Sequence, residues 1–284
     1  MNSSKSLVFG GGGIAGLGWL AGLIYGLFEA GVDLRDADRM IGTSAGAATA
    51  AQLFSSQTIE RLYARQTEPA LIADETPPSL VQLAKTMATF TKLLAIADSG
   101  ERMRAMGALA KATPSVPPEV RRAMIERRLA DHVWPQAALT ITAVDADSGE
   151  LVAFDAASGI GLVDAVGASC AVPGVWPVVA LGGRSYIDGG VLSADNAQLA
   201  AGSARVLVLS PFGHSGPFAP GFRLADQIVA LEAAGTSVLA IEPDPAARAS
   251  MGANPLDPAI RIPSAMAGRV QGKGMAVQIA DFWR

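Results

Sequence analysis

Short, unbroken apolar runs alternate with longer segments of helical character along this chain of 284 residues. Strands covered on both faces of a sheet read as continuous apolar runs, and their alternation with helices is typical of an α/β fold. We therefore expect a mostly parallel central sheet with helices on both faces. The expected strands are Leu7–Phe9, Arg39–Ile41, Leu139–Val144, Leu151–Phe154, Ser185–Ile187, Val206–Leu209 and Val238–Ile241.

The stretch Ser6–Phe28 carries no charged residue. Its length permits a membrane span, but the four consecutive glycines Gly10–Gly13 would break a helix where lipid demands internal hydrogen bonds. A removed signal peptide is the weaker alternative, because Lys5 alone makes a thin basic region and no convincing cleavage site follows. We interpret the stretch as a buried strand, a glycine turn and a buried helix, Ile14–Ala30, which ends at Gly31.

Residues 56–131 differ from the rest because helical patterns run through them without a strand between. We expect a helical insertion within a single domain that spans residues 1–284. The insertion is either a mobile cap over a pocket or a set of helices packed permanently on the core, and the sequence favours neither.

Composition adds limits to this picture. The chain is 50% hydrophobic, which is ample for a large core, and its net charge of -4 offers no basic excess for nucleic acid. Residues 85–128, however, carry nine basic and four acidic side chains, a local excess of +5. Such a segment either meets an anionic surface, as in peripheral membrane contact, or forms solvated helix faces.

Cys170 is the single cysteine, so no disulfide forms within the chain. That usage suits a reducing compartment and predicts a cytoplasmic location. His132 and His214 are the only histidines, and no cluster of histidine and cysteine offers metal ligands. We expect neither a metal nor another cofactor.

Two glycine-rich turns near the start of the chain carry the candidate chemistry. Gly10–Gly16 follows an apolar run and offers backbone N–H groups to a negative charge. Gly42–Gly46 follows Met40-Ile41, leads into a second buried helix, Ala45–Phe54, and places the Ser44 hydroxyl on a tight bend. A nucleophile beside an oxyanion hole indicates acyl transfer; the alternative is that the serine only caps the helix.

The first turn has a second interpretation. Gly11, Gly13 and Gly16 match the dinucleotide-binding fingerprint, which requires an acidic residue at the end of a second strand. The nearby aspartates precede the next strand instead of ending it, and this reading leaves Gly42–Gly46 unexplained. A non-hydrolytic nucleotide-binding protein is therefore a minor alternative. The aspartates are Asp33, Asp36 and Asp38.

A serine nucleophile needs a base, and two candidates exist. Asp188 stands where a short apolar strand ends in Gly189-Gly190, a position that projects a carboxylate from a strand end. The order Ser44, Asp188, His214 also matches the triad of the α/β-hydrolases. An esterase with that triad remains open, although His214 lies in a glycine- and proline-rich loop.

Four blocks of the sequence together resemble the patatin-like phospholipases. They are Gly10–Gly16, Gly42–Gly46, Ala168–Pro177 and Asp188–Gly190. The likeness covers roughly residues 5–55 and 139–210. It implies a three-layer patatin-like fold and a serine-dependent lipid acyl hydrolase whose partner is a lipid or acyl ester substrate.

By this resemblance, Ser44 and Asp188 form a catalytic dyad without a histidine. One departure limits the resemblance: many members of the family carry Arg or Lys where this chain has Ala15, so a phospholipid is no better supported than a lysolipid, a neutral ester or a thioester. The resemblance assigns the oxyanion hole to the backbone N–H groups of Gly11, Gly12, Gly13 and Ala45. The other glycines of the shared motifs are Gly16, Gly42, Gly46, Gly189 and Gly190.

Overall fold

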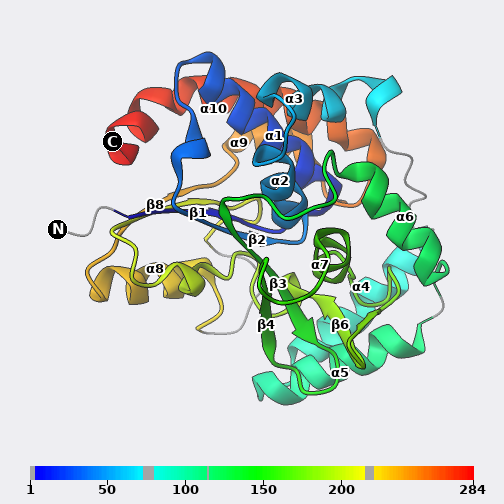
Figure 1. Ribbon diagram of the computed structural model, residues 1–284. Coiled ribbons are helices and arrows are strands. Elements are labelled where there is room, and N and C mark those ends of the chain that lie inside the picture. Colours follow the sequence, from blue (N-terminus) through cyan, green and yellow to red (C-terminus); the bar gives the residue numbers. More distant parts are fainter. Residues whose placement is uncertain (1–3, 73–79, 114, 215–220) are drawn as a thin grey trace.

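A mostly parallel sheet forms the middle layer of the protein (Figure 1). The computed structural model describes residues 4–72, 80–113, 115–214 and 221–284, and within them the sheet has eight strands. All seven expected strands are present; β5 was missed because it is only three residues long and never fully buried. The strands are β1 (Lys5–Phe9), β2 (Arg39–Thr43), β3 (Ala138–Asp145), β4 (Leu151–Phe154), β5 (Val179–Leu181), β6 (Arg184–Asp188), β7 (Arg205–Leu209) and β8 (Ser237–Ile241).

The strand order is β5-β6-β3-β2-β1-β7-β8, with β4 paired to β3 outside this path. From β3 to β8 every neighbouring pair is parallel, whereas β4 and β6 pair with β3 in the antiparallel direction and β5 pairs likewise with β6. In β1, Leu7 and Phe9 enter the core on one face of the sheet, and Val8 enters the core on the other. This burial on both faces explains the unbroken apolar run.

Helices cover both faces of the sheet, as expected (Figure 1). One layer contains α1, α2, α7 and α10, and the opposite face packs against α5 and α8. The α-helices are α1 (Gly13–Glu29), α2 (Ala45–Leu53), α3 (Ile59–Thr67), α4 (Leu80–Leu94), α5 (Ser99–Ala112), α6 (Pro118–Arg128), α7 (Leu162–Ser169), α8 (Leu224–Ala233), α9 (Pro245–Met251) and α10 (Arg261–Trp283). Short 3₁₀ turns occupy Leu34–Asp36, Pro69–Leu71, Gly189–Val191, Ala197–Ala200 and Pro258–Ile260.

The uncharged stretch divides into β1, a glycine turn and α1, which confirms the interpretation as a buried strand and helix. Gly31 has a φ of 86° directly after the helix, the left-handed conformation that glycine adopts at a helix end. Among the described residues, no helix combines the length and the apolar character needed to cross a membrane.

The buried helix α1 packs against α10, near the opposite end of the chain (Figure 1). Glycines on both helices allow the two backbones to touch. A Cβ atom added at Gly22 would lie 2.0 Å from the Ala265 carbonyl oxygen, and one added at Gly268 would lie 2.3 Å from that of Trp19. Any larger side chain at these positions would force the helices apart.

The described part of the expected insertion at 56–131 contains helices joined by short loops and no strand, and residues 73–79 and 114 lie outside the described residues. α3 and α6 bury Leu62 and Ile125 in the main core, and α5 buries Met103 and Met106 against the other face of the sheet. These three helices therefore pack against the core through buried side chains. The positive charge of the segment is only partly on the surface, because three of its arginines are buried: Arg102, Arg121 and Arg128.

Candidate active site

The two glycine turns lie side by side because β1 and β2 are parallel neighbours. Phe9 pairs with Gly42, so both strands end at the same edge of the sheet. A Cβ atom at Gly46 would lie 2.0 Å from the Phe9 carbonyl oxygen, and one at Gly42 would lie 2.6 Å from the Ala47 Cα. Only glycine at these two positions lets α2 begin so close to both strands.

Ser44 occupies the bend between β2 and α2 with a φ of 54° and a ψ of -116°. A positive φ is uncommon for a residue with a side chain and costs on the order of 1–3 kcal/mol, and such strain clusters at functional sites. The side chain makes no capping hydrogen bond to the helix. The helix-cap interpretation of this serine is therefore wrong.

The Ser44 hydroxyl instead donates a hydrogen bond of 2.7 Å to the Asp188 carboxylate at Oδ2. Both side chains are buried, with exposed fractions of 8% and 3%. Strand register produces this meeting: Thr43 pairs with Thr142 on β3, and the next residue of β3, Ala143, pairs with Asp188 on β6. The two candidate residues thus approach across one strand.

Three consecutive residues at the C-terminal end of α7, starting with its last residue, hold this pair together. The Ser169 hydroxyl accepts a hydrogen bond of 2.8 Å from the Ser44 N–H, and the Cys170 thiol donates to the Ser44 carbonyl over 3.3 Å. The Ala171 carbonyl accepts the Asp188 N–H at 3.0 Å. In the sequence, Cys170 stands out only as the single cysteine, because no local pattern reveals these long-range contacts.

Burial raises the pKa of Asp188 to about 7. The hydrogen bonds from the Ser44 hydroxyl and the Gly190 N–H oppose this rise, as does the positive charge of Arg121. The Gly190 N–H reaches the other carboxylate oxygen, Oδ1, at 2.7 Å. A carboxyl group with this pKa is ionised in part at neutral pH and is a stronger base than an exposed aspartate.

A polar network absent from the sequence expectations supports the neighbouring backbone. The Asn196 side-chain amide donates to the Ser193 carbonyl at 2.8 Å and to the Thr43 hydroxyl at 3.1 Å. The Thr43 and Thr142 hydroxyls lie 2.8 Å apart, and a Cβ atom at Gly189 would lie 2.5 Å from the latter. The network links the end of β2 to the turn after Asp188.

The expected oxyanion donors divide into two groups. The Gly11 N–H donates to the Ala194 carbonyl at 2.8 Å, so this donor is already occupied. The N–H groups of Gly12, Gly13 and Ala45 make no hydrogen bond to another described residue. The last two begin α1 and α2, where backbone N–H groups point out of the helix.

Close packing shapes the glycine run. A Cβ atom at Gly12 would lie 2.5 Å from Pro211 Cβ, and one at Gly16 would lie 3.2 Å from Pro211 Cγ. Gly13 has a φ of 61°, and its added Cβ atom would lie 2.6 Å from the Pro255 carbonyl oxygen. The turn therefore needs glycine for its conformation and for the approach of two distant segments.

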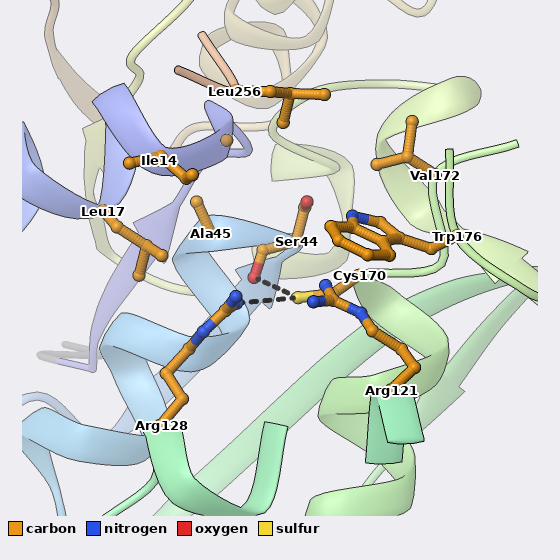
Figure 2. Close-up of a pocket in the computed structure, with 11 residues that line it drawn as sticks. Ile14, Leu17, Ser44, Ala45, Arg121, Arg128, Cys170, Val172, Trp176 and Leu256 are labelled. Carbon is orange, nitrogen blue, oxygen red and sulfur yellow. Dashed lines mark hydrogen bonds between the residues drawn. The ribbon is translucent and has the colours of Figure 1, made fainter. Parts of the chain in front are cut away.

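A pocket opens directly at Ser44 (Figure 2). It draws side chains from the start of α1, from α6, from the segment after α7 and from the chain before α10. Its wall combines apolar groups with two arginines, Arg121 and Arg128, that extend from α6 toward Cys170. The apolar lining includes Ile14, Leu17, Val172, Trp176 and Leu256.

The structure does not bring His214 to this pair. Its ring is 41% exposed and pairs with Glu242 at 3.3 Å, while the Asp188 oxygens contact Ser44 and Gly190. The geometry therefore lacks the histidine of a classical triad between serine and aspartate.

Two of the three acidic residues of the nucleotide interpretation lie at the wrong end of the sheet. Asp36 and Asp38 bind the side chain and backbone N–H of Lys5, at the start of β1, whereas Gly10 follows the end of that strand. Ala15 is 1% exposed and brings no charge to the glycine run. Within the described residues, no group of three or more histidine, cysteine and acidic side chains is placed to hold a metal ion.

A comparison of the sequence with known protein families agrees with the four blocks that resemble the patatin-like phospholipases. The sequence profile described as Patatin-like phospholipase matches residues 7–201. No curated protein sequence matches the chain significantly. Among solved structures, the chain is similar to VipD from Legionella pneumophila, with 13% identity and a TM-score of 0.48, over 98% of this chain and 67% of that one. It is also similar to the type III effector protein ExoU, with 16% identity and a TM-score of 0.42, over 98% of this chain and 53% of that one.

Proposed function

The chain belongs to the patatin-like phospholipase family and is an acyl ester hydrolase, and we propose that it cleaves a lipid-like carboxylic ester through a dyad of Ser44 and Asp188. The observation that carries this proposal is the direct hydrogen bond of 2.7 Å from the Ser44 hydroxyl to the Asp188 carboxylate. The strained backbone of Ser44 at the end of β2 is a second supporting feature.

In the proposed first step, Asp188 accepts the hydroxyl proton while Ser44 Oγ attacks the carbonyl carbon of the ester. The bond from carbon to the leaving oxygen then breaks, and the proton passes from the aspartate to the departing alcohol. An acyl-enzyme remains on Ser44. Water attacks this ester with the same aspartate as base, which releases the carboxylic acid and restores the serine.

We assign the oxyanion hole to the N–H groups of Gly12, Gly13 and Ala45. Negative charge develops on the carbonyl oxygen in both steps, and preorganised backbone donors stabilise it strongly in a site that excludes water. The N terminus of α2 adds a favourable dipole. Gly11 is left out of this set because its N–H is bonded to Ala194.

The apolar part of the pocket supports an acyl chain as the group held beside Ser44. Ile14 and Leu17 on α1 and Leu256 from the chain before α10 line the pocket (Figure 2). Burying methylene groups against such walls contributes about 0.8 kcal/mol for each group.

A fluorophosphonate probe and a short-chain ester test the proposal. Wild type should be labelled at Ser44, and Ser44→Ala should lose both labelling and at least about 10³-fold in kcat. Asp188→Asn should lose a similar factor, since the amide cannot accept the proton. His214→Ala is the matched control and should change kcat by less than about threefold.

Two results would overturn the dyad. One is hydrolysis that persists in folded Ser44→Ala. The other is a loss of several orders of magnitude in His214→Ala, which would restore the triad alternative. Circular dichroism and thermal unfolding of each variant separate a chemical effect from misfolding.

A further inference from the structure

Two arginines from one helix reach the wall of the Ser44 pocket. Arg121 and Arg128 are seven positions apart, which is two helical turns, so they share one face of α6. Their exposed fractions are 4% and 6%. Arg122 and Arg127, on the same helix, are exposed to solvent.

Burying a guanidinium group is costly, because the charge loses its hydration. Arg121 is held in place by Trp176: its Cζ lies 3.8 Å from the centre of the indole ring. Stacking of this kind uses the flat face of the guanidinium and keeps its N–H groups in the plane for an acceptor at its edge. Trp176 thereby orients the arginine inside the pocket.

Arg128 lies on the other side of Cys170 (Figure 2). Its Nη1 is 3.9 Å from the Cys170 sulfur, which is a weak acceptor. The same thiol donates to the Ser44 carbonyl, so Cys170 alone lies between the Arg128 guanidinium and the backbone of the proposed nucleophile. The charge of Arg121 also reaches this centre, because it lowers the pKa of Asp188 against the larger effect of burial.

On the basis of the proposed function, we propose that Arg121 and Arg128 determine specificity by binding an anionic group, of the phosphate class, that the ester substrate carries beside its scissile bond. Guanidinium forks match the oxygens of a phosphate and form charge-assisted hydrogen bonds with them. The opposite, apolar wall of the pocket then accommodates the acyl chain. Ala15 supplies no charge in the glycine run, so the cationic wall comes from α6.

A matched pair of substrates tests this assignment: 1-acylglycerol 3-phosphate and 1-acylglycerol, with the same short acyl chain and below the concentration at which micelles form. The readout is the ratio of kcat/KM for the two esters. We expect Arg121→Gln and Arg128→Gln each to lower this ratio about 10- to 100-fold, because each removes a hydrogen bond to a charged group. Arg127→Gln removes the same charge from the exposed face of α6 and should leave the ratio within about twofold of wild type.

An unchanged ratio in both pocket variants, or an equal fall in Arg127→Gln, would overturn the assignment. The ester without phosphate separates this failure from that of the proposed function: its hydrolysis must still depend on Ser44. If a pocket variant does not fold, wild type provides a second measurement. Glycerol 3-phosphate should slow fluorophosphonate labelling of Ser44, glycerol should not, and equal effects of the two would contradict the proposal.

Discussion

Ser44 and Asp188 are 144 positions apart in the sequence, yet their side chains share a hydrogen bond of 2.7 Å at the end of β2. Thr43, which precedes Ser44, pairs with Thr142 on β3. Asp188 pairs with Ala143, the next residue of the same strand. The distance between the two groups is therefore governed by the sheet, which is a rigid support for a reaction that tolerates little misplacement.

The pH dependence of hydrolysis follows from the pKa of Asp188. The proposed base must be ionised, so kcat should rise about tenfold per pH unit below pH 7 and level off above it. Arg121→Gln should move the inflection to higher pH, because the positive charge that lowers this pKa is lost. A pH–rate profile on a neutral short-chain ester measures both effects. An inflection near pH 4, or none between pH 5 and 9, would contradict the role of Asp188.

The Ser169 hydroxyl should matter to the rate although it does not touch the proposed reacting atoms. It accepts the N–H of the strained Ser44, and leaving a buried donor without its partner costs about 1–3 kcal/mol. We expect Ser169→Ala to lower kcat about 10-fold and to change KM little. Ser250→Ala is the control, since that hydroxyl bonds within its own helix. Equal kcat values in wild type and Ser169→Ala would show that the bond does not position the serine.

Contact between the backbones of α1 and α10 should dominate the effect of substitutions there. Gly22→Ala places a methyl group against the Ala265 carbonyl and should lower the free energy of unfolding by on the order of 3 kcal/mol. Gly274→Ala on α10 meets nothing within 4 Å and should raise it by up to about 1 kcal/mol through helix propensity. Chemical denaturation of the two variants measures the contrast. Similar stabilities would mean that the helices can separate at no cost.

A second buried carboxyl, Asp195, should make stability depend on pH. It is 2% exposed, lies against Gly10 and receives a hydrogen bond from Ser210, and burial raises its pKa to about 7. Because this pKa is higher in the folded than in the unfolded protein, the folded state holds the proton between about pH 4 and 7. The contribution of this carboxyl to the free energy of unfolding is therefore fully present below about pH 4. It is lost as the pH rises through the folded-state pKa of about 7.

Asp195→Asn removes this titration while Asp188 keeps its own. Between pH 5 and 7, the stability of wild type relative to the variant should fall by roughly 1 kcal/mol per pH unit. Unfolding by denaturant at several pH values gives the slope. A stability difference that stays constant with pH would show that Asp195 does not hold a proton in the folded protein.

Local patterns alone were enough to predict seven of the eight described strands and both glycine turns. The unbroken apolar run around Val8 predicts a buried strand. Gly42 and Gly46 predict a sharp bend, because glycine has no side chain to block the close approach of the backbone. These signals depend on residues adjacent in the chain, so the sequence by itself determined an α/β fold with a serine on a strand-to-helix bend.

Only the tertiary structure decided which distant residues meet. The register across β3 brings Asp188 to Ser44 and leaves His214 with Glu242. The packing of α6 turns Arg121 into the pocket although the sequence shows only a basic segment. Such pairings depend on sheet register and on the packing of whole elements, which no window of neighbouring residues encodes. The sequence thus identified the chemical groups, and the fold determined how they are combined.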